Sequence, residues 1–334
     1  MSQKFKVVGL GNALMDALYR LEDDTLLEEH TLRKGEMHQV DHTRWMEVYD
    51  QLVKNKVHLQ TGGSCANTIA TLGLMGLKVS FCSKVGGDEL GEEYKKQLIH
   101  ACGQHDLLIQ ADASTGKCLS LISPNAERTM LTDLAVSIQL DSIEHFQQSL
   151  QSTEVLYLTG YLMFGKMRAR LYEAIAIAKD AGAKIALDVA DPSVVAVCRA
   201  EMLEIIKEHV DIVFLNKAEA QALCGGTPES AIEALAAYCS VVVVKLGAEG
   251  SLVRMGEEQA YADIFSVEAI DTTGAGDSYA AGFLYAYLQG WPLEVMVRLA
   301  SRVAAQAVSQ LGAVVRDREI LRNILMEMAH EYSL

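Results

Sequence analysis

Short, almost continuously apolar runs alternate with longer amphipathic stretches over most of this 334-residue chain. A strand covered by helices on both faces is apolar at every position, so this alternation predicts a parallel sheet between two helical layers. The predicted strands are residues 6–11, 78–83, 154–160, 184–189, 211–216 and 240–247. The predicted helices are residues 64–76, 88–101, 166–181, 194–208, 217–224 and 229–238, followed by 276–289, 293–310 and 316–330. The fold class is therefore α/β, a doubly wound and mostly parallel sheet flanked by helices.

Two segments, about residues 12–44 and 110–135, interrupt this alternation. Residues 117–133 have the pattern of two strands joined by a turn at Pro124-Asn125, and residues 12–44 show little helical period before "DHTRWMEVYDQLV". Together they are expected to form a small antiparallel sheet, a lid over the cleft of the main domain. With four prolines, no repeat and no low-complexity tract, residues 1–334 are predicted to be a single domain.

Charge and cysteine content narrow the range of partners. The formal net charge is −15 and no basic cluster occurs, which argues against nonspecific binding to nucleic acid or to an anionic membrane. The seven cysteines are widely spaced and odd in number, as expected for reduced thiols in the cytoplasm without disulfides or zinc. No signal peptide and no membrane span are predicted. The expected partner is a small-molecule substrate, and monomer and homodimer both remain open.

The segment "DTTGAGDSYAAGF", residues 271–283, carries the most specific chemistry. It follows "YADIFSVEAI", which has the pattern of a strand end, and leads into a helix, the place where open α/β sheets bind ligands. The small residues Gly274, Ala275 and Gly276 would let successive backbone N–H groups point at one anion. Asp277 would then act as general base on a substrate hydroxyl, a contribution of about 10²–10⁴ in rate. The alternative is that Asp277 only caps the helix.

Four motifs together resemble the ribokinase/PfkB family of ATP-dependent kinases. "DTTGAGDSYAAGF" resembles its C-terminal signature and "GGSCANTIATLGLMG", residues 62–76, its N-terminal signature. "NKAE", residues 216–219, matches its N-x-x-E motif, and "KLGAEG", residues 245–250, resembles the end of its nucleotide-loop strand. Motifs in the family's order extend from residue 9 to about residue 312. The resemblance implies a ribokinase-like sheet flanked by helices with a small β lid, which agrees with the pattern above.

On the ATP side, the resemblance implies that Asp277 is the catalytic base and that residues 274–276 form an anion hole for the transferring phosphoryl group. Asn216 and Glu219 would order Mg²⁺ and the triphosphate, Glu219 through water. The alternative for this pair is a helix N-cap with a capping-box glutamate. Gly247 and Gly250 would line the nucleotide cleft.

Four further positions are weaker candidates on the same side. Ala304 and Gly312 match nucleotide-cleft positions, and Lys245 either faces the phosphates or simply ends a strand. In several family members the first aspartate of the C-terminal signature helps to hold a monovalent cation. Asp271 matches that position, so the resemblance leaves activation by K⁺ open.

On the acceptor side, Asn12 and Asp16 in "GNALMD" match family residues that bind sugar hydroxyls. Gly62, Gly63 and Asn67 match a second hydroxyl-binding group. A carboxylate and two amides suit a vicinal diol, because each can hold hydroxyls in fixed geometry. For Gly62-Gly63 a tight turn into the next helix is also expected.

Two further side chains are acceptor-side candidates. Arg128, near the lid turn, would close over substrate or phosphate, or else is an exposed lid side chain. Tyr161 in "YLTGYLMF" would stack on a purine base, or else packs in the core or lid.

The acceptor is predicted to be adenosine or a close nucleoside, converted by ATP to the 5′-monophosphate. "LLEEHTLRKGEMHQVD", residues 26–41, and "GNALMD" resemble the adenosine-kinase branch, whereas many sugar-specific members carry a P-x-x-G-E lid segment that this chain lacks. The alternative acceptor is a pentose or hexose, as in ribokinases and fructokinases. Other classes fit less well: an oxidoreductase fingerprint in "GLGNAL" would need glycine at Leu14. A nucleotide binder without catalysis and a structural protein also remain as alternatives.

Overall fold

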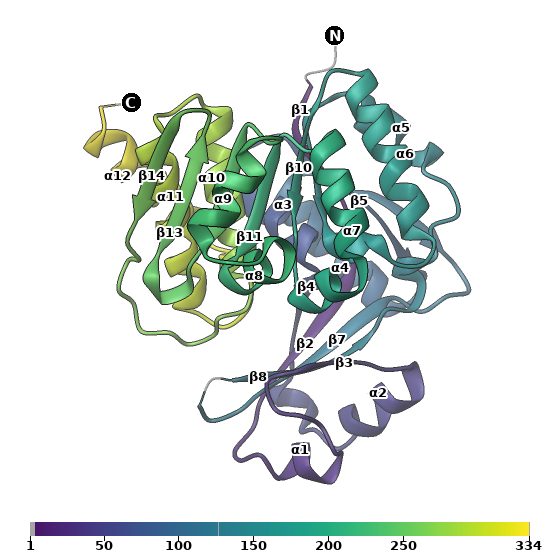
Figure 1. Cartoon of the computed structure of the whole chain (residues 1–334). Helices are drawn as coiled ribbons and strands as arrows, with labels where there is room; N and C mark the ends of the chain where they lie inside the picture. Colours follow the sequence, from purple (N-terminus) through teal and green to yellow (C-terminus); the bar gives the residue numbers. More distant parts are fainter. Residues whose placement is uncertain (1–3, 126, 334) are drawn as a thin grey trace.

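The computed structural model describes residues 4–125 and 127–333 and contains two sheets (Figure 1). The larger sheet has nine strands in the order β14-β13-β12-β11-β10-β9-β1-β5-β6, parallel except for the two pairings at the β14 edge. Its strands are β1 (Phe5–Leu10), β5 (Val79–Gly86), β6 (Asp106–Gln110), β9 (Thr153–Thr159), β10 (Lys184–Asp188), β11 (Ile212–Asn216), β12 (Val241–Lys245), β13 (Ser251–Met255) and β14 (Glu258–Ala262). The predicted α/β class with a mostly parallel sheet is confirmed.

Helices cover both faces of the large sheet. One layer consists of α3 (Ser64–Leu74), α4 (Glu89–Cys102), α10 (Ala275–Leu288), α11 (Leu293–Val308) and α12 (Arg318–Glu331). The other consists of α5 (Gln147–Gln151), α6 (Met167–Asp180), α7 (Pro192–His209), α8 (Lys217–Cys224) and α9 (Pro228–Ala236). Neighbouring strand residues such as Val213 and Phe214 point into opposite apolar clusters, which is why these strands are apolar at every position.

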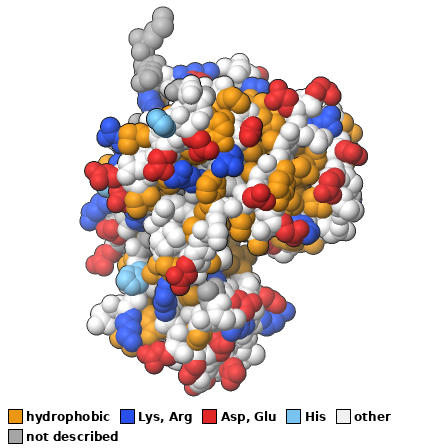
Figure 2. Space-filling view, turned by 90° about the vertical axis from the view of Figure 1, so that its left-hand side faces the viewer, with side chains coloured by type: hydrophobic (Ala, Val, Ile, Leu, Met, Phe, Trp, Pro, Cys, Tyr) orange, Lys and Arg blue, Asp and Glu red, His pale blue; other side chains and the backbone are white. Residues whose placement is uncertain are grey.

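The smaller sheet has five strands in the order β3-β8-β7-β2-β4. They are β2 (Leu14–Arg20), β3 (Met37–Gln39), β4 (His58–Gly62), β7 (Gly116–Ile122) and β8 (Arg128–Asp133). Two helices, α1 (Thr25–Glu29) and α2 (His42–Tyr49), contribute to an apolar cluster of its own around Trp45, Val48 and Leu119. Figure 2 shows this unit as a lower lobe set off from the rest of the molecule.

Two expectations for this unit need correction. The sheet is mixed rather than antiparallel, because β2 pairs with β7, and β3 with β8, in parallel. β2 follows β1 and β7 follows β6, and these two strands run in the same direction in the large sheet, so both segments enter the small sheet in the same direction. The sheet also includes β4, which lies outside residues 12–44 and 110–135.

The segment before the glycine-rich motif, predicted to contain the end of a strand, does so only in its first two residues. β14 ends at Ala262, and residues 263–274 contain no strand. The chain must cross here from the sheet edge back to its middle, where α10 packs against α3, so residues 263–274 do not continue β14. Among the helices of the described ranges, none combines the length and apolar character needed to cross a membrane.

Candidate active site

The glycine-rich turn forms the start of α10. Gly274 is the N-cap residue with φ +71°, and a Cβ there would lie 2.4 Å from the carbonyl oxygen of Ala313, so only glycine fits. The backbone nitrogen of Ala275 lies 3.4 Å from the carbonyl oxygen of Thr272, a long hydrogen bond. The ammonium of Lys245 would lie 3.1 Å from a Cβ at Gly276. A helix N-terminus and a lysine therefore meet at this turn, an arrangement that favours an anion.

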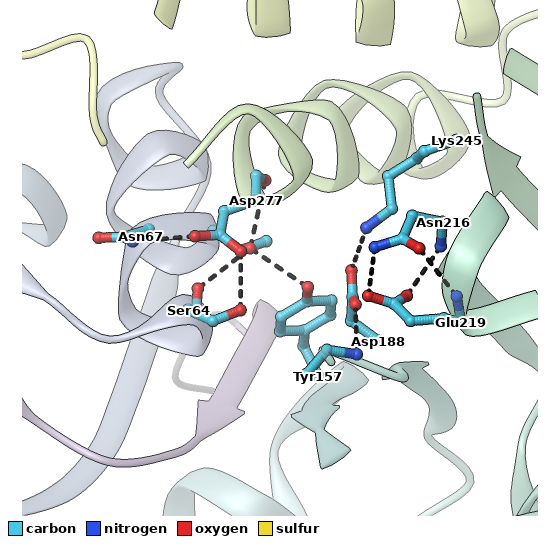
Figure 3. Close-up of polar contacts among 10 residues, drawn as sticks. Ser64, Asn67, Tyr157, Asp188, Asn216, Glu219, Lys245 and Asp277 are labelled. Carbon is cyan, nitrogen blue, oxygen red and sulfur yellow. Dashed lines mark hydrogen bonds and ion pairs between the residues drawn. The ribbon is translucent and has the colours of Figure 1, made fainter. Parts of the chain in front are cut away.

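Asp277 lies in the first turn of α10 and is held by two side chains of α3 (Figure 3). The Ser64 hydroxyl donates to Oδ1 at 2.7 Å, and the Asn67 amide donates to Oδ2 at 2.9 Å. Burial raises the pKa of Asp277 above its usual range, and the two hydrogen bonds oppose that rise by favouring the carboxylate. A carboxylate with a raised pKa is a stronger base than a free aspartate.

A second polar group lies at the carboxyl ends of β10, β11 and β12 (Figure 3). Lys245 donates to Oδ2 of Asp188 at 2.7 Å; the Asp188 side chain is buried, and that of Lys245 is 14% exposed. Asn216 caps α8, and Glu219 accepts from its backbone N–H at 2.8 Å and from its side-chain amide at 2.5 Å. The capping box foreseen as the alternative for this pair is thus present. Burial and then the charge of Asp188 raise the pKa of Glu219, and Lys245 opposes that rise.

Asp271 ties the turn to the segment after α11. Its Oδ1 accepts from the backbone N–H and the hydroxyl of Thr273 at 2.9 and 2.5 Å, and its Oδ2 accepts from the N–H of Gly312 at 2.9 Å. Arg128, from β8 of the small sheet, donates to the Thr273 hydroxyl. Arg128 is therefore half-buried at the turn, and the alternative of an exposed lid side chain is wrong.

Two of the proposed acceptor residues, Asp16 and Gly62, lie on neighbouring strands of the small sheet. Asp16 on β2 is 7% exposed and lies directly opposite Gln60 of β4, which is 8% exposed. Burial raises the pKa of Asp16 to about 7, and the charge of Arg128 opposes the rise. A Cβ at Gly62 would lie 2.2 Å from the Asp16 carboxyl group, so Asp16 fills the space that a larger residue would need.

Three buried polar atoms near Asp16 have no hydrogen-bond partner within residues 4–125 and 127–333. They are Oδ1 of Asn12, Oδ1 of Asn67 and Nε2 of Gln60. An unpaired buried polar atom costs about 1–3 kcal/mol, so such atoms are uncommon unless a ligand or water completes them. Their clustering on the elements around Asp16 and Asp277 identifies this region as a candidate binding site.

The remaining predicted residues are placed as follows. Gly63 has φ +96°, and a Cβ there would lie 2.3 Å from the Asn12 carbonyl oxygen, so the expected tight turn into α3 is present. Gly250 has φ +89° and closes the connection from β12 to β13. Gly247 begins a short helical turn between the same strands, and Ala304 is half-buried on α11. Tyr161, in a one-turn helix after β9, packs against the core beside α5–α9, as its packing alternative expected.

Sequence reasoning missed three residues of the site: Asp188, Ser64 and Gln60. Asp188 is the second-last residue of the predicted strand 184–189 and the last of β10, and a charged residue at the end of a buried run was the available signal. Ser64 follows the Gly62-Gly63 pair directly, but nothing local relates it to Asp277. Gln60 is two residues before Gly62 and therefore shares its face of β4, a signal that becomes readable only once β4 is known to be a strand.

The fold is shared with small-molecule kinases of known structure. The chain superposes on an adenosine kinase from Sinorhizobium meliloti with a TM-score of 0.89 and 31% identity, covering 97% of this chain and 99% of that one. It superposes on a probable sugar kinase from Rhizobium etli with a TM-score of 0.88 and 28% identity, covering 99% of both. These similarities define a ribokinase-like α/β kinase fold with a second, smaller sheet.

The family follows from the sequence match. The family model described as pfkB family carbohydrate kinase matches residues 37–318, and the chain belongs to this family of ATP-dependent kinases. A 5-dehydro-2-deoxygluconokinase from Lacticaseibacillus casei is 27% identical over 94% of this chain and 92% of its own length. The relatives therefore include kinases named for a nucleoside and kinases named for sugars, and the family implies ATP and a divalent metal.

Proposed function

We propose that this protein transfers the γ-phosphoryl group of ATP to a hydroxymethyl group of a ribose-containing acceptor, adenosine or a close nucleoside. The observation that carries the proposal is the pairing of two sites. Asp277 stands beside a glycine turn at a helix N-terminus, and across from it lie a buried carboxylate and unpaired amide atoms on the acceptor side. Phosphoryl transfer needs mostly positioning and charge stabilisation, and these groups supply both.

In this proposal Asp277 takes the proton of the acceptor hydroxyl while its oxygen attacks the γ-phosphorus. The N–H groups of residues 274–276 and the positive end of the α10 dipole stabilise the charge on the transferring group. Lys245 lies beside Gly276 and adds positive charge at the same place. Gly247 and Gly250, with Ala304 and Gly312 as weaker candidates, line the nucleotide cleft.

The donor atoms suit a metal that keeps most of its water. Both oxygens of Glu219 accept hydrogen bonds from Asn216, and the described residues contain no group of three or more metal-ligating side chains. Mg²⁺ sheds its waters reluctantly, so Asn216 and Glu219 would hold it through water. When bound, Mg²⁺ neutralises charge on the triphosphate. Asp271 is the candidate for K⁺, although its oxygens already accept three hydrogen bonds.

For the acceptor, the carboxylate of Asp16 and the free amide oxygens of Asn12 and Asn67 would accept hydrogen bonds from a pair of ribose hydroxyls. Tyr161 is the candidate for stacking on the base. The overall similarity to an adenosine kinase, at 31% identity over nearly the whole chain, favours the nucleoside.

A pentose or hexose kinase is the second candidate, and one observation favours a charged sugar. Arg128 and Arg316 both act electrostatically on Asp16, so positive charge is available on the acceptor side. Guanidinium groups match carboxylate and phosphate in geometry. An acceptor such as a sugar acid or sugar phosphate would use them, whereas a neutral nucleoside would not.

An ADP-release assay tests the proposal with adenosine, other nucleosides, ribose, fructose and fructose phosphates as acceptors. We expect the highest kcat/KM with adenosine, and phosphorus NMR should identify a 5′-monophosphate. Turnover of a sugar or sugar phosphate without any of adenosine would reject the nucleoside and favour the second candidate. No turnover with any acceptor would reject the function as a whole.

A further inference from the structure

The hydroxyl of Ser64 is hydrogen-bonded to the proposed catalytic base, Asp277. It donates to Oδ1 of Asp277 at 2.7 Å, while Asn67 donates to Oδ2 (Figure 3). Both oxygens of Asp277 are therefore bonded by side chains of α3 before any acceptor is present. An acceptor hydroxyl must displace one of these donors or share an oxygen with it.

Ser64 is the more displaceable of the two donors. Its side chain is partly exposed, whereas Asn67 is 5% exposed. The hydroxyl is not needed to cap α3, since Gly63 is the N-cap residue and no side-chain cap is formed there. Within the described residues, the bond to Asp277 is the only hydrogen bond recorded for the Ser64 side chain. The hydroxyl thus serves Asp277 rather than the local fold.

We propose that Ser64 keeps water away from Asp277 until the acceptor binds, and so selects an alcohol over water as the nucleophile. The proposal rests on the proposed function, because it requires that Asp277 be the base of a phosphoryl transfer. A water bonded to Oδ1 would stand beside the glycine turn, where the acceptor hydroxyl is expected. Ser64 Oγ already bonds this oxygen at a normal O–H···O⁻ distance.

The acceptor displaces Ser64 more readily than a water does, because the acceptor makes further contacts that a water lacks. A ribose-containing acceptor brings further hydroxyls for Asp16 and for the unpaired oxygens of Asn12 and Asn67. These contacts offset the lost bond between Ser64 and Asp277. A water has no such contacts, so replacing the tethered serine hydroxyl by a water gains no binding free energy.

Without the serine hydroxyl, hydrolysis becomes the expected side reaction. The oxygen of a water at Oδ1 forms a bond to the γ-phosphorus, and the bond from that phosphorus to the β,γ-bridging oxygen breaks. The water gives one proton to Asp277, and ADP and inorganic phosphate are the products.

The experiment measures phosphate release from Mg²⁺ and ATP in the absence of acceptor. We expect Ser64→Ala to raise the rate at least tenfold over the unsubstituted protein, and Ser64→Thr, which keeps a hydroxyl, to restore the low rate. The double variant Ser64→Ala/Asp277→Asn should lose the gain. Thr68→Val is the matched control on α3, since the Thr68 hydroxyl contacts the backbone carbonyl of Asp277 and not its carboxylate, and should leave phosphate release unchanged.

Two results would overturn the proposal. One is unchanged phosphate release in Ser64→Ala and in Ser64→Gly while ATP binding and the unfolding midpoint match those of the unsubstituted protein. The other is phosphate attached to Ser64 after incubation with ATP, found by mass spectrometry, since Ser64 would then be an acceptor itself. Retained transfer to the acceptor in these variants would show that only the exclusion of water has failed. An unsubstituted protein that transfers to no acceptor would instead reject the proposed function.

Discussion

Replacing Asp277 by asparagine removes the proposed base and keeps the shape of the side chain. The new amide oxygen can accept from Asn67, and the new NH₂ group can donate to Ser64, whose hydroxyl can accept as well as donate. The fold and the ATP site should therefore survive. General-base catalysis is worth about 10²–10⁴ in rate, so kcat should fall by that factor, or about 2.7–5.4 kcal/mol in activation free energy.

The assay compares kcat from ADP release with the Kd for ATP from calorimetry. We expect the Kd to change by less than about threefold, because the lost free energy belongs to the transition state. Asp180→Asn, at the exposed end of α6, is the control for the loss of one negative charge. A kcat within about threefold of the unsubstituted protein would refute the role of Asp277 as base. Parallel loss of ATP binding and kcat would instead indicate a structural role.

Three further substitutions test the surroundings of the site. Gly62→Ala places a Cβ 2.2 Å from the Asp16 carboxyl group and should displace it. In a steady-state titration, the KM for the acceptor should rise about tenfold or more while the KM for ATP changes little. An unchanged acceptor KM would contradict the proposed role of Asp16. Lys245→Met leaves the buried Asp188 without its cation. Urea unfolding should show a free energy of unfolding lower by about 3–5 kcal/mol. A loss below about 1 kcal/mol would mean that the pair behaves like a surface ion pair. The pKa of Asp16 is raised from 3.8 to about 7, so the folded protein holds a proton there that the unfolded chain releases, and this carboxyl lowers stability as pH rises through that window. Asp16→Asn should therefore gain stability relative to the unsubstituted protein from about pH 4 to about pH 7 in urea unfolding, and a pH-independent difference would argue against the raised pKa.

The large sheet could be predicted because burial on both faces leaves a local signal. Val213 and Phe214 face opposite apolar clusters, and a run of such residues predicts a central strand without knowledge of its neighbours. The small sheet gave no comparable signal for strand direction. Alternation along β2 and β7 specifies which residues share a face, but the direction of pairing depends on where each segment leaves the large sheet.

The glycine turn and the position of Asp277 at the start of α10 could be predicted because these residues are adjacent in sequence. Gly274 and Asp277 lie in one turn, and the need for glycine can be inferred from the motif alone. The contacts that tune Asp277 could not be predicted this way. Ser64 and Asp277 are 213 positions apart, and Lys245 meets Asp188 across 57 positions, so only the packed fold brings these pairs together.

The small sheet carries its own apolar cluster around Trp45, which shares no residue with the two clusters of the large sheet. Amino-acid replacements confined to the Trp45 cluster therefore leave the clusters of the large sheet, including the packing of α10, unchanged. That separability gives a physical reason why kinases named for adenosine and for sugars share one architecture.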